Sequence, residues 1–151
     1  MQITRGFSLI ELITILAIIG IISAIALPRF FNDDSFNNRG FYTEVLNATR
    51  YSQQLAVLIN CNTRVALTVN SYSVTLDDDP INCSGNSFTT QARNPVTGEI
   101  GFSGNSGTVP ITPDTITFNA LGAVNNDSEI TVGGFTFCVN AVTGYINEGT
   151  C

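Results

Sequence analysis

The sequence contains no histidine, no lysine and no tryptophan, and only one methionine. Without histidine, the Ser-His-Asp and Cys-His arrangements of nucleophilic enzymes are impossible, and without lysine a Ser-Lys pair is impossible too. No segment singles out a pair of carboxylates for acid–base chemistry. We therefore expect that the protein is not an enzyme.

Positive charge is equally scarce. The chain has six basic residues, all Arg, and 12 acidic ones, so its net charge is −6 at pH 7. An acidic chain repels phosphate backbones, and the last basic residue is Arg93. Nucleic acid is therefore not a favoured partner.

Metal-binding patterns are also missing. The sequence has neither a Cys-x-x-Cys pair nor a histidine, so the common zinc-binding spacings cannot be formed. The run Asp77-Asp78-Asp79 could collect oxygen ligands for calcium, but the spacing of an EF-hand is absent. We interpret it as a solvated turn and expect no metal and no cofactor.

Four cysteines are present: Cys61, Cys83, Cys138 and Cys151. An even count in a small exported domain indicates two disulfides, for which three connectivities are possible. Cys138 and Cys151 flank the last hairpin-like segment, which favours Cys138–Cys151 together with Cys61–Cys83. Each bridge could contribute about 3 kcal/mol by restricting the unfolded chain.

The N-terminus contains the longest apolar run. From Phe7 to Leu27 the only charged residue is Glu11, and a helix of this length spans about 30 Å, the thickness of a bilayer core. A secretory signal peptide would need a small-x-small cleavage site, and Ala24-Ile25-Ala26 runs directly into Leu27-Pro28. A plain signal anchor with Arg5 on the cytoplasmic side is the other simple interpretation.

Neither interpretation explains Glu11. A carboxylate in a membrane costs about 2.5–3.5 kcal/mol on insertion scales, so it normally has a partner. If the chain were cut after Gly6, Phe7 would carry a new ammonium group one helical turn from Glu11. That partner would lie in the same chain or in a packed neighbour.

The segment Arg5-Gly6-Phe7-Ser8-Leu9-Ile10-Glu11-Leu12 closely resembles the cleavage and N-methylation signature of type IV prepilins and type II secretion pseudopilins, and the resemblance extends through Leu27-Pro28. It implies that a prepilin peptidase cuts after Gly6 and methylates Phe7. It also implies that Glu11 registers the subunit against its neighbour in a filament.

Gly20 and Pro28 are candidate positions for a kink. Proline removes a backbone donor, and glycine loosens a helix interior by up to about 1 kcal/mol relative to alanine. The resemblance implies local bending near both residues in a filament. Alternatively, Pro28 simply marks the membrane exit.

The remaining sequence predicts an α+β head. Residues 29–40 are polar and rich in helix breakers, which predicts a weakened helix or short break before a helix resumes at Phe41. Its apolar stripe is expected at Phe41, Val45, Ala48, Leu55 and Ile59, with Ser52 in the polar gap. Alternation then predicts a hairpin turning at Asn70-Ser71.

Further strands are expected within 116–118, 130–132, 135–139 and 142–147, with turns at Gly133-Gly134 and Thr143-Gly144. The breaker-rich region from Asp77 to Pro113 predicts long loops with one or two short strands.

The stretch Phe41–Val74, with its Arg-Tyr-x-x-x-x-Ala pattern, resembles the GspH/FimT type of minor pseudopilins and minor pilins, which includes subunits of the MSHA pilus. The expected fold is therefore that of type IV pilins, a long helix with a transmembrane half and an amphipathic half, packed on an antiparallel sheet. The boundaries are a leader at 1–6, a membrane or filament-core helix at 7–28, and an amphipathic helix with its head at 29–151.

The resemblance implies a structural subunit that helps to initiate and assemble a type IV pilus or a type II secretion filament. Its partners would be other pilin subunits, the prepilin peptidase, the inner-membrane assembly platform and the bilayer. It would cross the bacterial inner membrane once, with a periplasmic head, before assembly. The alternatives are the major subunit of such a filament and a DNA-binding minor pilin of a competence system.

Overall fold

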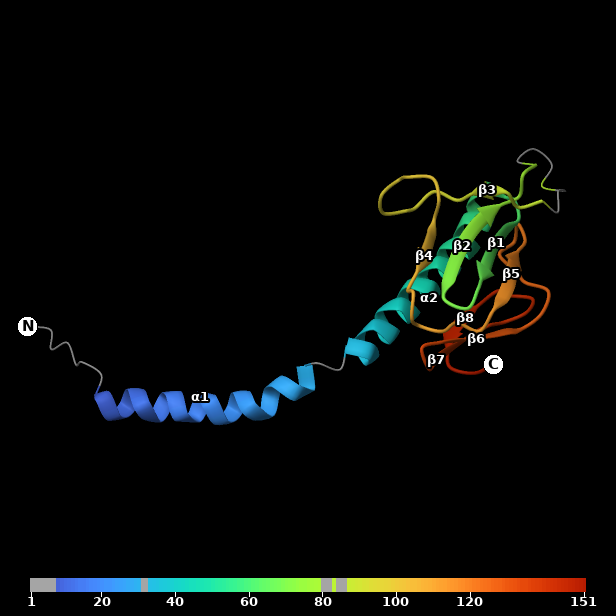
Figure 1. Cartoon of the computed structure of the whole chain (residues 1–151). Helices are drawn as coiled ribbons and strands as arrows, with labels where there is room; N and C mark the ends of the chain where they lie inside the picture. Colours follow the sequence, from blue (N-terminus) through green and yellow to red (C-terminus); the bar gives the residue numbers. More distant parts are fainter. Residues whose placement is uncertain (1–7, 31–32, 80–82, 84–86) are drawn as a thin grey trace, which may run out of the picture. The chain divides into compact units, whose positions relative to one another are not determined.

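The computed structural model describes residues 8–30, 33–79, 83 and 87–151 (Figure 1). The chain divides into two compact units, Met1–Phe36 and Asn37–Cys151. The first contains helix α1, and the second contains most of helix α2 and all of the strands.

Helix α1 runs from Leu9 to Phe30, and both Gly20 and Pro28 lie within that range. A bend at either residue therefore stays a prediction. None of the helices has, over its described residues, the length and apolar content required of a membrane span. The transmembrane role assigned to residues 7–28 likewise remains a prediction.

Helix α2 runs from Asp33 to Ile59, so it begins well before Phe41, where the sequence led us to place its start. A break within residues 33–40 is therefore wrong, whereas the alternative of a weakened helix in that segment stays a prediction. An acidic residue in the first turn, such as Asp34, favours a helix start because it faces the positive end of the helix dipole. The two residues between α1 and α2 lie outside the described ranges.

One face of α2 is buried from Phe41 to Ala56. Phe41, Val45, Ala48 and Ser52 are buried as expected and Leu55 is partly buried, whereas Ile59 is exposed. A second row completes the face, and its polar member Thr49 donates its hydroxyl to the Val45 carbonyl oxygen at 2.9 Å. This row consists of Tyr42, Leu46, Thr49 and Ala56. The buried face is therefore wider than a single stripe.

The larger sheet contains five antiparallel strands: β1 (Thr63–Leu67), β2 (Ser71–Leu76), β3 (Thr90–Gln91), β4 (Ser103–Asn105) and β5 (Asp114–Phe118). Its order is β3-β2-β1-β5, and β4 also pairs with β2. Strands β3 and β4 follow one another along the same edge of β2, because β1 occupies the other edge. The predicted hairpin, now β1–β2, and the short strands expected between residues 77 and 113 are confirmed.

The smaller sheet has the order β6-β7-β8, with strands Ser128–Val132, Phe135–Val139 and Ile146–Glu148. Gly133 and Gly134 join β6 to β7, and both have positive φ, as a tight hairpin turn requires. The strand expected over 142–147 is confirmed only from Ile146 onward. Val142 and Gly144 have φ of 67° and 64°, which a β-strand does not permit, so this segment forms a turn instead.

A single core joins α2 to both sheets (Figure 1). Tyr42 packs against Phe135 and Phe137 of the small sheet, with ring centroids 5.5 and 6.1 Å apart. On the large sheet, the fully buried residues include Val65, Val74, Ile116 and Phe118. The predicted α+β architecture, a helix packed on antiparallel sheets, is confirmed.

Candidate functional site

The N-terminal candidates lie partly outside the described structure. Gly6 and Phe7, the expected cleavage residues, are not among the described positions, whereas Glu11 occupies the first turn of α1. The backbone N–H groups of Glu11 and Leu12 both donate to the Ser8 carbonyl oxygen, at 3.0 and 3.2 Å. The Glu11 side chain is exposed. Nothing in the described chain therefore neutralises this carboxylate.

Helix α1 exposes apolar side chains on every side. Each large hydrophobic residue between Leu9 and Ile22 is exposed, from 41% for Ile15 to 76% for Leu9. A helix that is apolar all round is normally buried in a protein core or in a membrane. The exposed apolar side chains of α1 are therefore suited to an apolar environment.

Both favoured disulfides are present. Cys61 is bonded to Cys83 and Cys138 to Cys151, each with 5.0 Å between Cα atoms. The first ties the end of α2 to the loop after β2, and the second ties β7 to the C-terminal residue.

The acidic run after β2 is more ordered than the solvated turn we expected. Asp77 is buried, and one of its carboxylate oxygens, Oδ1, accepts the Asp79 N–H at 3.0 Å. The Asp78 carboxylate accepts the hydroxyls of Ser87 and Thr89 and the N–H groups of Thr89 and Thr90. These hydrogen bonds hold the pKa of Asp78 well below its usual range. No cluster of three metal-ligating side chains occurs among the described residues.

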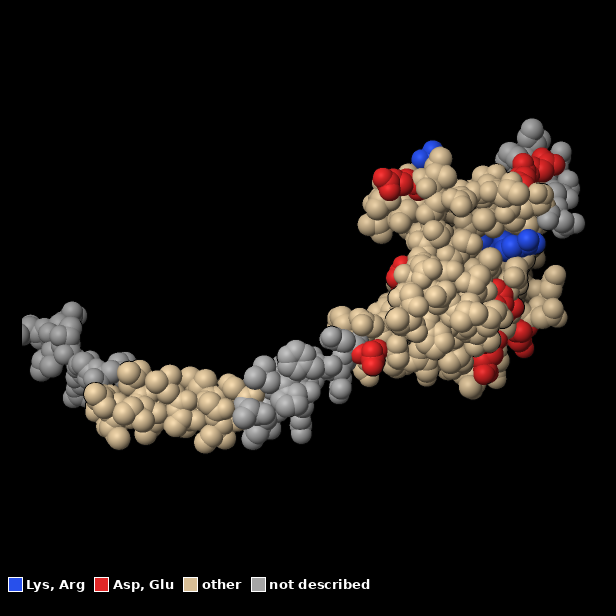
Figure 2. Space-filling view, in the orientation of Figure 1, with Lys and Arg blue, Asp and Glu red and all other residues tan. Residues whose placement is uncertain are grey.

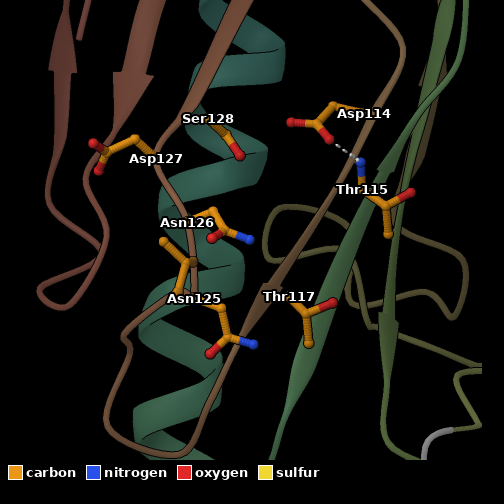
Figure 3. A pocket seen from close by; sticks show the side chains of 8 residues that line it. Asp114, Thr115, Thr117, Asn125, Asn126, Asp127 and Ser128 are labelled. Carbon is orange, nitrogen blue, oxygen red and sulfur yellow. Dashed lines mark hydrogen bonds between the residues drawn. The ribbon is translucent and has the colours of Figure 1, made fainter.

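A polar cleft lies between β5 and the segment that leads into β6 (Figure 3). It has a volume of about 320 Å³. Asp114 accepts the N–H of Thr115 at 2.7 Å, and Asp127 accepts the N–H of Ala141 at 2.5 Å. Its lining, which we call the acidic cleft, consists of Asp114, Thr115, Thr117, Val124, Asn125, Asn126, Asp127 and Ser128.

The sequence did not reveal this cleft. Its two aspartates are separated along the chain by a loop and belong to no recognisable motif. They come together because β5 and the strand β6 lie at the edges of two different sheets. On the face shown in Figure 2, acidic side chains are spread over the head and basic ones are sparse.

Two of the arginines stack on aromatic rings. The Arg64 guanidinium lies 3.7 Å from the ring centroid of Phe88 and also donates to Thr117 Oγ1 at 3.4 Å. The Arg39 guanidinium lies 5.2 Å from the ring centroid of Phe135. Both guanidinium groups are therefore engaged within the chain.

Comparisons with known proteins agree with this architecture. Residues 1–27 match the family described as the prokaryotic N-terminal methylation motif. No curated protein sequence matches the chain.

Among solved structures, the chain is similar to two crystal structures of the type IV minor pilin FimU of Pseudomonas aeruginosa strain PAO1. In the first, identity is 14%, 72% of this chain and 89% of that chain are covered, and the TM-score is 0.50. In the second, identity is 12%, the coverage is 75% and 88%, and the TM-score is 0.51. At this identity the likeness establishes the fold.

Proposed function

We propose that this type IV pilin-like protein is a minor subunit of a type IV pilus or type II secretion filament that helps to initiate and assemble the filament. The observation that carries the proposal is α1, which exposes apolar side chains on every side behind an N-terminal methylation motif. Such a helix is suited to a membrane before assembly and to a bundle of similar helices afterwards.

The proposed life cycle begins with a single pass through the bacterial inner membrane and a periplasmic head. A prepilin peptidase cuts between Gly6 and Phe7 and methylates Phe7. Other pilin subunits and the inner-membrane assembly platform then receive the chain. Glu11, exposed in the first turn of α1, pairs with the new N-terminal ammonium of a neighbouring subunit.

Similarity of the fold to a minor pilin supports a minor rather than a major role. The two roles are distinguished by the amount of this chain relative to other subunits in sheared filaments, which is low for a minor subunit and high for the major one. The fold is that of structural pilins, which are not enzymes, and the proposal includes no catalytic step.

The test is the intact mass and N-terminal sequence of the protein from cells with and without the prepilin peptidase. We expect a chain beginning at methylated Phe7 only when the peptidase is present. A chain that keeps Met1–Gly6 in both strains, or that is cut near Ala26, would rule the proposal out.

Glu11 provides a second test of the same proposal. Glu11→Ala should leave the membrane-bound amount unchanged or higher, because it removes a charge from an apolar helix. The amount in sheared filaments should fall at least about tenfold, since breaking a buried ion pair costs about 3–5 kcal/mol. Quantitative immunoblots of membrane and filament fractions measure both.

Thr14→Ala is the matched control for Glu11→Ala, because Thr14 is a polar residue one turn further along α1 whose hydroxyl bonds only to the Glu11 carbonyl oxygen at 2.9 Å. It should enter filaments normally. Normal incorporation of Glu11→Ala would refute the role assigned to this carboxylate.

A further inference from the structure

Five large apolar side chains are exposed at one end of the head, on three segments that meet there. Val57 and Leu58 come from the end of α2, Leu121 from the β5–β6 connection, and Val142 and Tyr145 from the β7–β8 connection. We call these five residues the loop patch. None of them is charged, and Leu58, Leu121 and Val142 are each more than 80% exposed.

Specific contacts fasten these three segments together. The Gln53 side-chain amide donates to the carbonyl oxygens of Gly122 and Thr143, at 3.1 and 3.3 Å. A methyl group on Gly122 would lie 3.0 Å from Val57 Cγ2, and one on Gly144 would overlap the Gly122 carbonyl oxygen. The three segments of the loop patch are therefore fixed to one another and form one continuous surface.

Val142, one of the five residues of the loop patch, has an unfavourable backbone conformation. Its φ of 67° is in the left-handed region, where a β-branched side chain is an outlier. The Val142 N–H donates to the Val124 carbonyl oxygen at 3.1 Å, which holds the conformation. Strain of this kind concentrates at functional surfaces, and here it displays an apolar side chain to solvent.

The acidic cleft lies directly beside the loop patch. Asp127 accepts the N–H of Ala141, the residue before Val142, and Val124 both lines the cleft and bonds to Val142. Among the described residues, the carboxylates of Asp114 and Asp127 accept backbone N–H groups, and the lining itself contains no basic residue. Arg64 reaches the lining through the hydroxyl of Thr117, to which its Nε donates at 3.4 Å. The surface thus has an apolar area with a net negative margin, since two carboxylates line the cleft beside one arginine.

This charge arrangement selects the kind of partner. A second copy would bring the same carboxylates to the interface, where like charges cost free energy. A surface that places Lys or Arg next to apolar side chains would instead satisfy both parts at once. Resting on the proposed filament role, we propose that the loop patch and the acidic cleft dock a different subunit of the same filament, one that presents apolar side chains beside a Lys or Arg.

Site-specific photocrosslinking in the full chain tests this proposal in cells that assemble the filament. A photoreactive phenylalanine derivative replaces Tyr145, which is aromatic and exposed, and the crosslinked peptides are identified by mass spectrometry. We expect an adduct with another filament subunit, at a surface that carries Lys or Arg.

Four further variants, each combined with the photoreactive residue at position 145, separate the contributions of the apolar side chains and of the carboxylates to docking. Val142→Asn removes the apolar side chain but suits the left-handed backbone, and Leu58→Gln acts on a helix surface, so neither should unfold the head. Each should lower the adduct yield about tenfold, as loss of a central interface side chain does. Asp127→Asn combined with Asp114→Asn keeps both acceptor atoms and removes the charge, and it should lower the yield about threefold. Val96→Asn, at an equally exposed valine outside the loop patch, should change nothing.

The outcomes separate this inference from the proposed function. Adducts with a second copy of this chain, or yields that the loop-patch variants do not change, would overturn the inference alone. The same holds if the chain is present in sheared filaments without any adduct. A chain that never enters filaments would overturn both.

Discussion

At Gly144 the β7–β8 connection closely approaches the β5–β6 connection. The φ of Gly144, 64°, is in the left-handed region, and the space where a Cβ would lie is filled by the Gly122 carbonyl oxygen. Both the backbone conformation and the contact therefore require glycine. Gly98 shares only the first requirement, because its φ is 73° but nothing lies within 4 Å.

Gly144→Ala should destabilise the protein by about 2–5 kcal/mol, since overpacking costs about 1–3 and a left-handed alanine about 1–2 kcal/mol. Gly98→Ala should cost only the about 1–2 kcal/mol of an alanine in the left-handed conformation. Thermal unfolding of the purified full chain in detergent compares the two. Equal melting temperatures would show that the close approach to Gly122 contributes nothing.

For single residues, the sequence predicted the turn at Gly144 and the unusual carboxylate Glu11, but not the contacts between distant segments. Thr143-Gly144 was recognisable as a turn because glycine marks one locally. The contact of Gly144 with Gly122, and the left-handed backbone of Val142, depend on segments distant in sequence, so no local pattern encodes them. Glu11 stood out because a lone carboxylate in an apolar run is costly wherever it folds.

Among the elements, the connection from β2 to β3 depends on one carboxylate. Asp78 lies just after β2 and collects hydrogen bonds from Ser87, Thr89 and Thr90, so it fixes the two ends of the loop together. Because these bonds favour the charged form, the pKa of Asp78 is lowered relative to that in the unfolded chain.

A lowered pKa means that Asp78 stabilises the fold above the unfolded value of about 4 and that this contribution is lost as the pH falls below it. Asp78→Asn should therefore lower the urea midpoint at neutral pH, and its difference from the unmodified chain should shrink as the pH falls below about 4. Glu99→Gln, at an exposed carboxylate, serves as the control. A difference that does not vary with pH would contradict the hydrogen-bonding explanation.

Most elements were predictable, because α2 and the hairpins have the periods of 3.6 and 2 that burial imposes. The start of α2 was not, because Asn, Asp and Gly between residues 33 and 40 favour a break locally, and the helix nevertheless continues through them. Strand β8 began later than expected because the turn around Val142 takes up residues that local propensity would place in a strand.

For the whole molecule, the division into two units separates the proposed membrane anchor from the disulfide-bonded head. The disulfides close loops with sequence separations of 22 and 13 residues, and both lie within the unit Asn37–Cys151. Their pairing was favoured from the sequence because each bridge joins neighbours along a predicted hairpin or helix end.

Reduction of both disulfides should destabilise the head by about 3 kcal/mol for each bridge in the chain-entropy model. This corresponds to a melting temperature lower by more than about 10 °C. The protein should remain in the membrane fraction, because α1 contains no cysteine. Thermal unfolding and fractionation with and without reductant measure both effects, and an unchanged melting temperature would count against the contribution of the bridges.

The tyrosines give the chain its own optical reporter. The hydroxyls of Tyr42 and Tyr51 on α2 donate to the carbonyl oxygens of Thr136 and Arg93, at 3.3 and 3.0 Å. The Tyr72 hydroxyl, on β2, donates to Glu44 Oε1 on α2 at 2.8 Å. Three of the four tyrosines therefore bridge α2 and the rest of the head, and with no tryptophan present their near-ultraviolet circular dichroism should change when α2 detaches from the sheets.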